Sequence, residues 1–129
     1  MERVKVNFEM SSQDAMVKFV SDGEIHESKI SFTDDDFSKH TIICQDSSID
    51  YFKIGAMDMN FRFDINRVTK GIYKIDNNIL EFSIITTKLE NTGNRLCIEY
   101  ELLHDNEVVN VSKLVINYSV TEEEFRCKA

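Results

Sequence analysis

Apolar and polar residues alternate with a period of two through most of this 129-residue chain. Because successive side chains of a β-strand point to opposite faces, this alternation predicts strands that are buried on one face. The segment MDMNFRFDI (57–65) carries its apolar face from Met57 to Ile65. Apolar residues also occupy alternate positions in RLCIEYELL (95–103), NILEFSIITTKL (78–89) and KLVINYSV (113–120). The sequence therefore predicts an all-β protein.

Short polar breaks separate these segments and predict tight turns. Gly, Asn and Asp tolerate the positive φ that hairpin turns require, and they gather in SDG (21–23), DNN (76–78), NTGN (91–94) and HDN (104–106). We predict ten strands, at residues 3–10, 14–20, 24–32, 39–45, 48–54, 57–65, 70–75, 79–89, 95–104 and 107–120. Strands at this spacing close into a barrel or form a sandwich, and we favour an antiparallel up-and-down β-barrel of eight to ten strands. One helix signal is retained, the capping-box spacing in TEEEF (121–125).

The chain is long enough for one hydrophobic core, and we expect one domain over residues 1–129. Acidic residues outnumber basic ones, 23 to 15, and the basic residues are scattered along the chain. A phosphate backbone would be repelled, so we expect no nucleic-acid partner. No run of 18 apolar residues and no secretory signal is present, so we expect no membrane partner. Three widely spaced cysteines indicate reduced thiols and a cytoplasmic location.

The sequence contains no recognisable catalytic motif. Its three histidines, His26, His40 and His104, are far apart and lie in no metal-binding pattern. The four glycines are not clustered into a phosphate-binding loop, and no nucleophile elbow is present. The acidic run 34–36 lacks the glycine and distal glutamate of a calcium loop, so we expect there a solvated turn or the first turn of a short helix begun by Thr33. We expect no metal, no cofactor and no enzymatic activity.

Three segments resemble the YwiB-like family, a bacterial group of unknown function whose members look like calycins. They are KIGAMDMNFRF (53–63), RVTKGIYKIDNNILEFSIITTKL (67–89) and GNRLCIEYELLHDNEVVNVSKLVINY (93–118). Residues that match the family pattern are Gly55, Met59, Phe63, Tyr73, Thr86 and Tyr100, and departures from it are Lys53, Ile75 and Asn78. The resemblance implies a calycin-like, lipocalin-like barrel whose interior could hold a small apolar ligand. It implies no enzymatic activity.

Candidate ligand-binding residues follow from alternation. Lys53 is two residues from Tyr51 on the same predicted strand, so both side chains point to the same side. If that side faces inward, a lysine lies in the core, where it could meet a carboxylate. The alternative is a register shift near Gly55 that turns Lys53 outward, which the rarity of buried lysines favours. Tyr73 and Tyr100 place a ring in the core with a hydroxyl that seeks a partner, and Met59 could line an adaptable cavity. For these residues plain core packing is the competing interpretation.

Three functional hypotheses remain open. The first is a non-enzymatic binder of a small apolar ligand in the barrel interior, with Lys53, Tyr51, Met59, Tyr73 and Tyr100 as its site. The second is a protein-interaction or homo-oligomeric domain, such as a homodimer, that uses apolar residues expected on the outer face, namely Ile79, Ile85 and Leu103. The third is an enzyme acting on a small metabolite, for which no base, nucleophile or metal ligand has supporting spacing.

Overall fold

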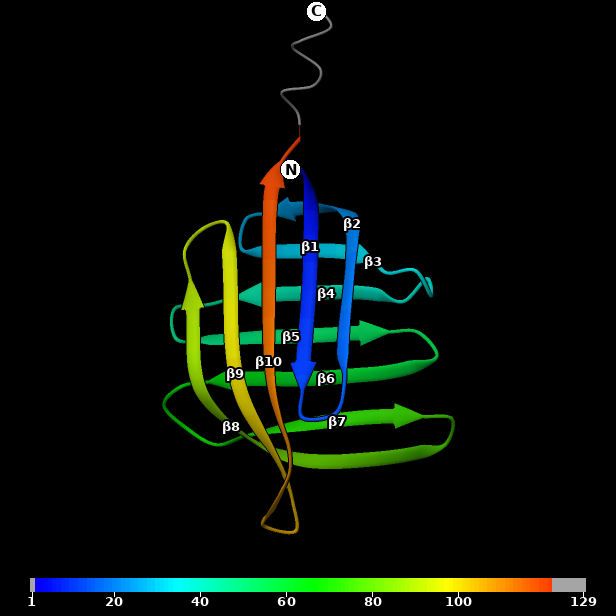
Figure 1. The fold of residues 1–129 in the computed structure, drawn as a ribbon, viewed down its shortest axis with the longest axis vertical. Coiled ribbons are helices and arrows are strands. Elements are labelled where there is room, and N and C mark those ends of the chain that lie inside the picture. The colour runs from blue at the N-terminus through cyan, green and yellow to red at the C-terminus, as the bar shows by residue number, and fades with distance from the viewer. Residues whose placement is uncertain (1, 122–129) are drawn as a thin grey trace, which may run out of the picture.

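The computed structural model describes residues 2–121, which form a closed antiparallel barrel of ten strands (Figure 1). Each strand pairs with the next one along the chain, and β1 also pairs with β10, which closes the barrel. The predicted all-β barrel is thus confirmed. The strands are β1 (Glu2–Ser12), β2 (Met16–His26), β3 (Lys29–Thr33), β4 (Lys39–Cys44), β5 (Ser48–Ile54), β6 (Met57–Asp64), β7 (Thr69–Ile75), β8 (Asn78–Asn91), β9 (Arg95–His104) and β10 (Glu107–Val120).

The barrel is flattened into two layers whose strands cross at a steep angle (Figure 1). Strands β3 to β7 run across the view, while β1, β9 and β10 run along its long axis. Strand β2 joins the layers by pairing with both β1 and β3, and β8 does so by pairing with both β7 and β9. Because direct neighbours alternate in direction, the turns alternate between two ends of the barrel.

We name the two ends by what they contain. The hairpin end carries the turns at 13–15, 34–38, 55–56, 76–77 and 105–106. The terminal end carries the remaining turns, at 27–28, 45–47, 65–68 and 92–94, together with both ends of the described chain. No helix that could span a membrane occurs in residues 2–121. The helix predicted at 121–125 falls almost wholly outside the described residues.

The prediction of a turn at 21–23 was wrong. Strand β2 continues through this segment, and Gly23 pairs with Val4 on one side and with Phe32 on the other. A Cβ at Gly23 would lie 2.7 Å from the backbone oxygen of Ser31, so this glycine permits close approach rather than a turn. The turn lies instead at 27–28, where Glu27 has a φ of 57°, and it divides the single strand predicted at 24–32. The chain leaves β6 at Asp64, so Ile65 is exposed and does not extend the inner face as predicted.

The inner face of the barrel is filled with apolar side chains. Leu96, Ile98 and Leu102 of β9 are buried there, as the alternation predicted. Aromatic rings fill the middle, where Phe61 lies edge-on to Phe63, Tyr73 and Tyr100, with ring centroids 5.0 to 6.3 Å apart. The core cluster comprises Val4, Val6, Phe8, Ile30, Phe32, Ile42, Ile49, Tyr51, Met59, Phe61, Phe63, Ile84, Leu96, Ile98, Tyr100, Leu102, Leu114 and Ile116.

Phe37, in the turn between β3 and β4, combines two unfavourable features. Its side chain is 88% exposed, and its φ is 64°, in the left-handed region. That conformation costs a residue with a Cβ about 1–2 kcal/mol, whereas glycine adopts it freely but loses more backbone entropy on folding. We therefore expect Phe37→Gly to raise the free energy of unfolding by up to about 1 kcal/mol. Urea unfolding followed by circular dichroism would measure this, and a loss of stability would show that Phe37 packs on the fold.

Candidate functional site

The five predicted ligand-binding residues all lie on the inner face of the barrel. Lys53 of β5 pairs with Met59 of β6, and Met59 pairs in turn with Tyr73 of β7. Tyr51 lies two residues before Lys53 on the same face, and Tyr100 contributes from β9. The strand order thus brings the five into one half of the interior. Tyr51, Met59 and Tyr100 are buried in the core, whereas Lys53 and Tyr73 are half-buried nearer the hairpin end.

The register around Lys53 is continuous, so the expected shift near Gly55 does not occur. Tyr51 pairs with Ile42 and Phe61, and Lys53 pairs with His40 and Met59, with no irregularity between the two positions. Lys53 therefore keeps the inward parity of Tyr51. Because β5 ends one residue later, at Ile54, Lys53 lies near the hairpin end and is only half-buried.

A chain of hydrogen bonds beside these residues was missed by the sequence analysis. The His40 side chain is 3% exposed, and its Nε2 lies 2.8 Å from Oδ2 of Asp34. On the other side, its Nδ1 lies 2.6 Å from the hydroxyl of Tyr51. An ionised carboxylate only accepts, so Nε2 carries the proton and Nδ1 accepts the Tyr51 hydroxyl hydrogen. His40 alternates with Ile42 and Cys44 along one strand, and this pattern could have identified it as an inward-facing residue.

Burial sets the protonation of this chain. Desolvation lowers the pKa of His40, outweighing the stabilising carboxylate of Asp34. Burial also raises the pKa of Tyr51 well above its usual range. For Asp34, burial opposes ionisation, but hydrogen bonds from His40 and from the Ser38 and Asp36 amides lower the pKa overall. The arrangement is therefore a neutral imidazole between a carboxylate and a neutral phenol, which anchors the turn at 34–38 to the core.

The aromatic packing around His40 leaves little room for a ligand at this level of the barrel. Phe32 stacks on the His40 ring with centroids 4.7 Å apart and an interplanar angle of 9°. Phe8 and Phe19 stack on each other at 4.6 Å and also face His40. A ligand that enters this barrel without displacing its core must therefore bind nearer to an end.

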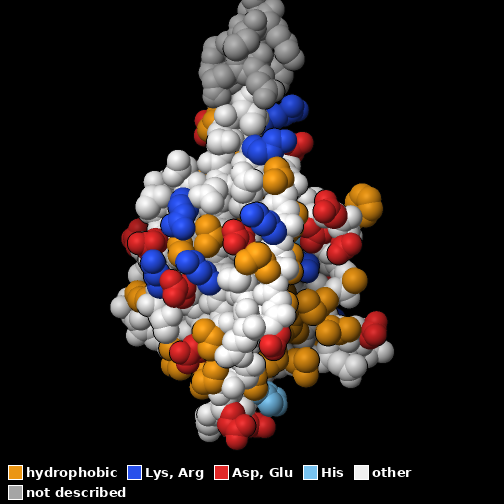
Figure 2. Space-filling view, viewed as in Figure 1, with side chains coloured by type: hydrophobic (Ala, Val, Ile, Leu, Met, Phe, Trp, Pro, Cys, Tyr) orange, Lys and Arg blue, Asp and Glu red, His pale blue; other side chains and the backbone are white. Residues whose placement is uncertain are grey.

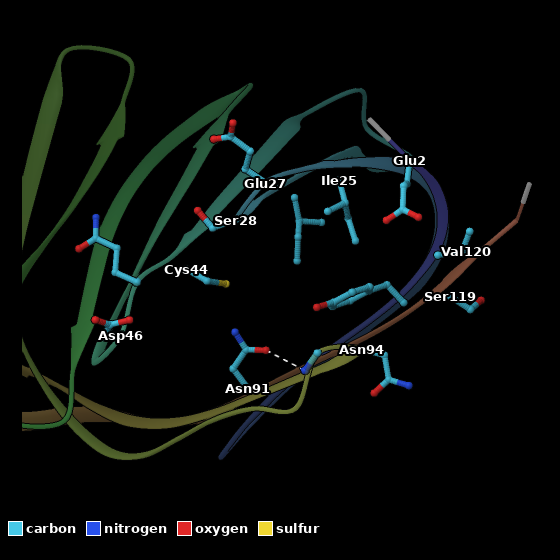
Figure 3. A pocket seen from close by; sticks show the side chains of 14 residues that line it. Glu2, Ile25, Glu27, Ser28, Cys44, Asp46, Asn91, Asn94, Ser119 and Val120 are labelled. Atoms are coloured by element: carbon cyan, nitrogen blue, oxygen red, sulfur yellow. Dashed lines mark hydrogen bonds between the residues drawn. The ribbon is translucent and has the colours of Figure 1, made fainter.

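A pocket of about 720 Å³ opens at the terminal end of the barrel (Figure 3). Its walls come from the start of β1, the turns after β2, β4 and β8, and the end of β10. In Figure 3 the sulfur of Cys44 points into the space between these segments. The lining comprises apolar or weakly polar groups (Ile25, Ile30, Cys44, Tyr118, Val120), neutral polar groups (Ser28, Gln45, Asn91, Asn94, Ser119), Gly93, and the carboxylates Glu2, Glu27 and Asp46. We call this the terminal pocket.

The chemistry of the terminal pocket suits binding by shape and hydrogen bonds. Burial raises the pKa of the Cys44 thiol and of the Tyr118 phenol, so both groups are neutral donors or acceptors at neutral pH. Asn91 Oδ1 accepts a hydrogen bond from the Gly93 amide at 3.1 Å, which fixes one side of the opening. None of the five sequence-predicted ligand-binding residues lines this pocket. Within residues 2–121, no group of three or more potential ligands could hold a metal ion.

The fold and its sites place the protein among closed antiparallel β-barrels, with a filled centre and a pocket at one end. More particularly, the chain belongs to the family described as "Domain of unknown function (DUF1934)", whose model matches residues 3–116. The fold is also that of the crystal structure of ywiB protein from Bacillus subtilis, with a TM-score of 0.73 and 18% sequence identity. That match covers 93% of this chain and 92% of the other. A comparison with curated proteins found no match.

Proposed function

We propose that this protein is a non-enzymatic binder of a small ligand and that the terminal pocket is its binding site. The observation that carries the proposal is the pocket itself, about 720 Å³ at the mouth of a barrel whose centre is filled. Ligand sites typically measure about 300–1,000 Å³ and combine apolar walls with a few polar groups. The terminal pocket has this size and this mixture, so its ligand has an apolar body and hydrogen-bonding groups.

Charge narrows the class of ligand. The charged residues that line the terminal pocket are all carboxylates, Glu2, Glu27 and Asp46, from three separate segments. A carboxylate or phosphate group would be repelled by them, whereas a neutral or positively charged group would not. This favours a neutral or cationic amphiphile over a fatty acid or a nucleotide.

The protonation of Cys44 and the hydrogen bonds of His40 support binding without catalysis. Cys44 is the one thiol in the lining, and its raised pKa keeps it protonated, whereas a reactive cysteine needs a lowered pKa. His40, the obvious candidate for a general base, is buried and already engaged through both ring nitrogens. Neither group is presented to a bound molecule as a catalytic residue would be.

Filling the pocket is expected to weaken binding at least tenfold. Ile25 faces inward on β2 and lines the terminal pocket, so Ile25→Trp would occupy part of its volume. We expect the neutral fluorescent probe Nile red to bind the native protein saturably, and the variant to bind it at least tenfold more weakly, roughly a 1.4 kcal/mol loss. Native and denaturing mass spectra of the purified protein would show whether a natural ligand is carried as well.

Phe37→Gly is the matched control, because it removes an apolar side chain from the opposite end of the barrel. It should bind Nile red like the native chain, and circular dichroism should show both variants folded. Absence of saturable binding to the native protein would contradict the proposal. Undiminished binding to Ile25→Trp would contradict it too, since the probe would then occupy another surface.

A further inference from the structure

Exposed large apolar side chains are concentrated at the hairpin end of the barrel. Of the fifteen such residues in the described part of the chain, nine lie in the five turns of this end or within three residues of them. Every turn contributes at least one. We call this set the apolar rim, and it comprises Met16, Val17, Phe37, Ile54, Ile75, Ile79, Leu80, Val108 and Val109. Figure 2 shows hydrophobic side chains gathered over the lower part of the molecule, where turns of this end lie in Figure 1.

The structure refines the outer-face residues predicted to mediate protein contact. Ile79 is 65% exposed and belongs to the apolar rim. Ile85 and Leu103 are only half-buried neighbours further along β8 and β9, so they are not part of it. Exposed apolar side chains that several separate segments contribute to one end of a barrel are typical of an interaction site rather than of scattered surface residues.

Phe37 is held outward by a rigid turn. Asp34 Oδ1 accepts hydrogen bonds from the amides of Asp36 at 2.9 Å and Ser38 at 3.0 Å, and the Phe37 amide donates to the Asp34 carbonyl at 3.1 Å. Asp34 Oδ2 is in turn tied to the buried His40. An exposed aromatic residue in a strained conformation, fixed by the surrounding structure, is a feature of binding sites. The turn that carries Phe37 is already ordered, so its backbone loses little conformational entropy when a partner covers the ring.

Charge indicates the kind of partner. Within three residues of these five turns, the range from which the apolar rim is drawn, there are eight acidic residues and four lysines, namely Asp14, Asp34, Asp35, Asp36, Asp58, Asp76, Asp105 and Glu107, and Lys18, Lys39, Lys53 and Lys74. This excess of negative charge opposes binding of a second copy of this chain, which carries the same excess, and of an anionic membrane surface. A partner with lysine or arginine beside apolar residues would complement both properties of the rim.

The barrel pairing leaves a partner two modes of contact. Every strand has a neighbour on each side, but residues 16–22 of β2 pair with β1 alone and residues 85–91 of β8 pair with β9 alone. The nine apolar side chains at the hairpin end favour contact through side chains over an added strand. We propose that the apolar rim binds a protein partner through a basic amphipathic segment, at the end of the barrel opposite the terminal pocket. This inference does not depend on the proposed ligand.

A tryptophan-labelled peptide can test the inference directly, because the chain contains no tryptophan. The probe is a synthetic helical peptide of leucine and lysine with one tryptophan, and its counterpart has glutamate in place of every lysine. We expect the tryptophan emission of the lysine peptide to shift to the blue with saturable binding, and that of the glutamate peptide to stay unchanged. Phe37→Gly and the double variant D35K/D36K should each weaken binding at least tenfold.

Val68→Ser is the matched control, since Val68 is 60% exposed but lies at the terminal end. It should bind the lysine peptide like the native chain. The proposal is overturned by absence of binding, by equal binding of the two peptides, or by rim variants that bind as tightly as the native chain. It is also overturned if sedimentation shows a dimer that Phe37→Gly dissociates, because a second copy of the chain would then cover the rim. Binding of the native chain to neutral phosphatidylcholine vesicles through the rim would overturn it too, because the rim would then bind a lipid surface.

Discussion

Replacing Phe61 by alanine is expected to lower the free energy of unfolding by about 3–5 kcal/mol. The Phe61 side chain is fully buried, and its ring packs against Tyr73 at 5.0 Å and Phe63 at 6.0 Å. Opposite the ring stands Gly71, where an added Cβ would lie 2.8 Å from Phe61 Cδ1 and 2.8 Å from Ile84 Cδ1. Backbone on one side and rings on the other leave few side chains that could move into the vacated space.

The magnitude is large in relation to the whole fold, since domains of this kind are stable by about 5–15 kcal/mol. Urea unfolding followed by far-ultraviolet circular dichroism would measure the change. Ile72→Ala offers a comparison on the neighbouring strand, because Ile72 points outward and is 37% exposed. It should cost less than about 1 kcal/mol. Equal losses from the two substitutions would show that the barrel centre is not the rigid core described above.

Alternation predicted most strands because it reports burial on one face directly. In β6, β9 and β10 most buried and exposed positions are those that the sequence indicated, but Asp64 and Cys97, which the alternation places on the outer face, are buried as well. The error at 21–23 has a physical cause, because glycine serves two purposes in β-proteins. It permits turns, and it also permits close approach of backbones. Gly23 permits close approach of backbones. Only the positions of Val4 and Ser31 in space show that it does not form a turn.

The candidate sites were less predictable because they are assembled from distant segments. Parity brought Lys53 and Tyr51 to one face, but the pairing of Lys53 with Met59 and of Met59 with Tyr73 depends on strand register. The bond between Asp34 and His40 links a turn to a strand, which no spacing rule describes. The terminal pocket draws on five separate segments, none of which has a motif. Chemistry of that kind appears only when the barrel closes.

Acidification through the range of His40 titration is expected to destabilise the barrel. The pKa of His40 is lowered in the folded protein, chiefly by burial. At a pH below about 6.5 the unfolded chain therefore binds a proton that the folded chain resists, and stability falls as pH decreases toward the folded pKa. The slope from one such group is at most about 1.4 kcal/mol per pH unit. The lowered pKa of Asp34 acts in the same direction at lower pH, where its stabilising contribution is lost on protonation.

His40→Phe isolates the contribution of His40. Phenylalanine keeps the stacking on Phe32 but removes both ring nitrogens, which leaves the buried Tyr51 hydroxyl without its acceptor. We expect a loss of about 1–3 kcal/mol at pH 7.5, and a flatter profile of unfolding free energy between pH 7.5 and 5.5 than in the native chain. Lys53, whose charge also disfavours the protonated imidazole, remains in place in both proteins. If the native and variant profiles ran parallel over this range, the pH dependence would have to arise from other groups, and the neutral His40 assigned here would be wrong.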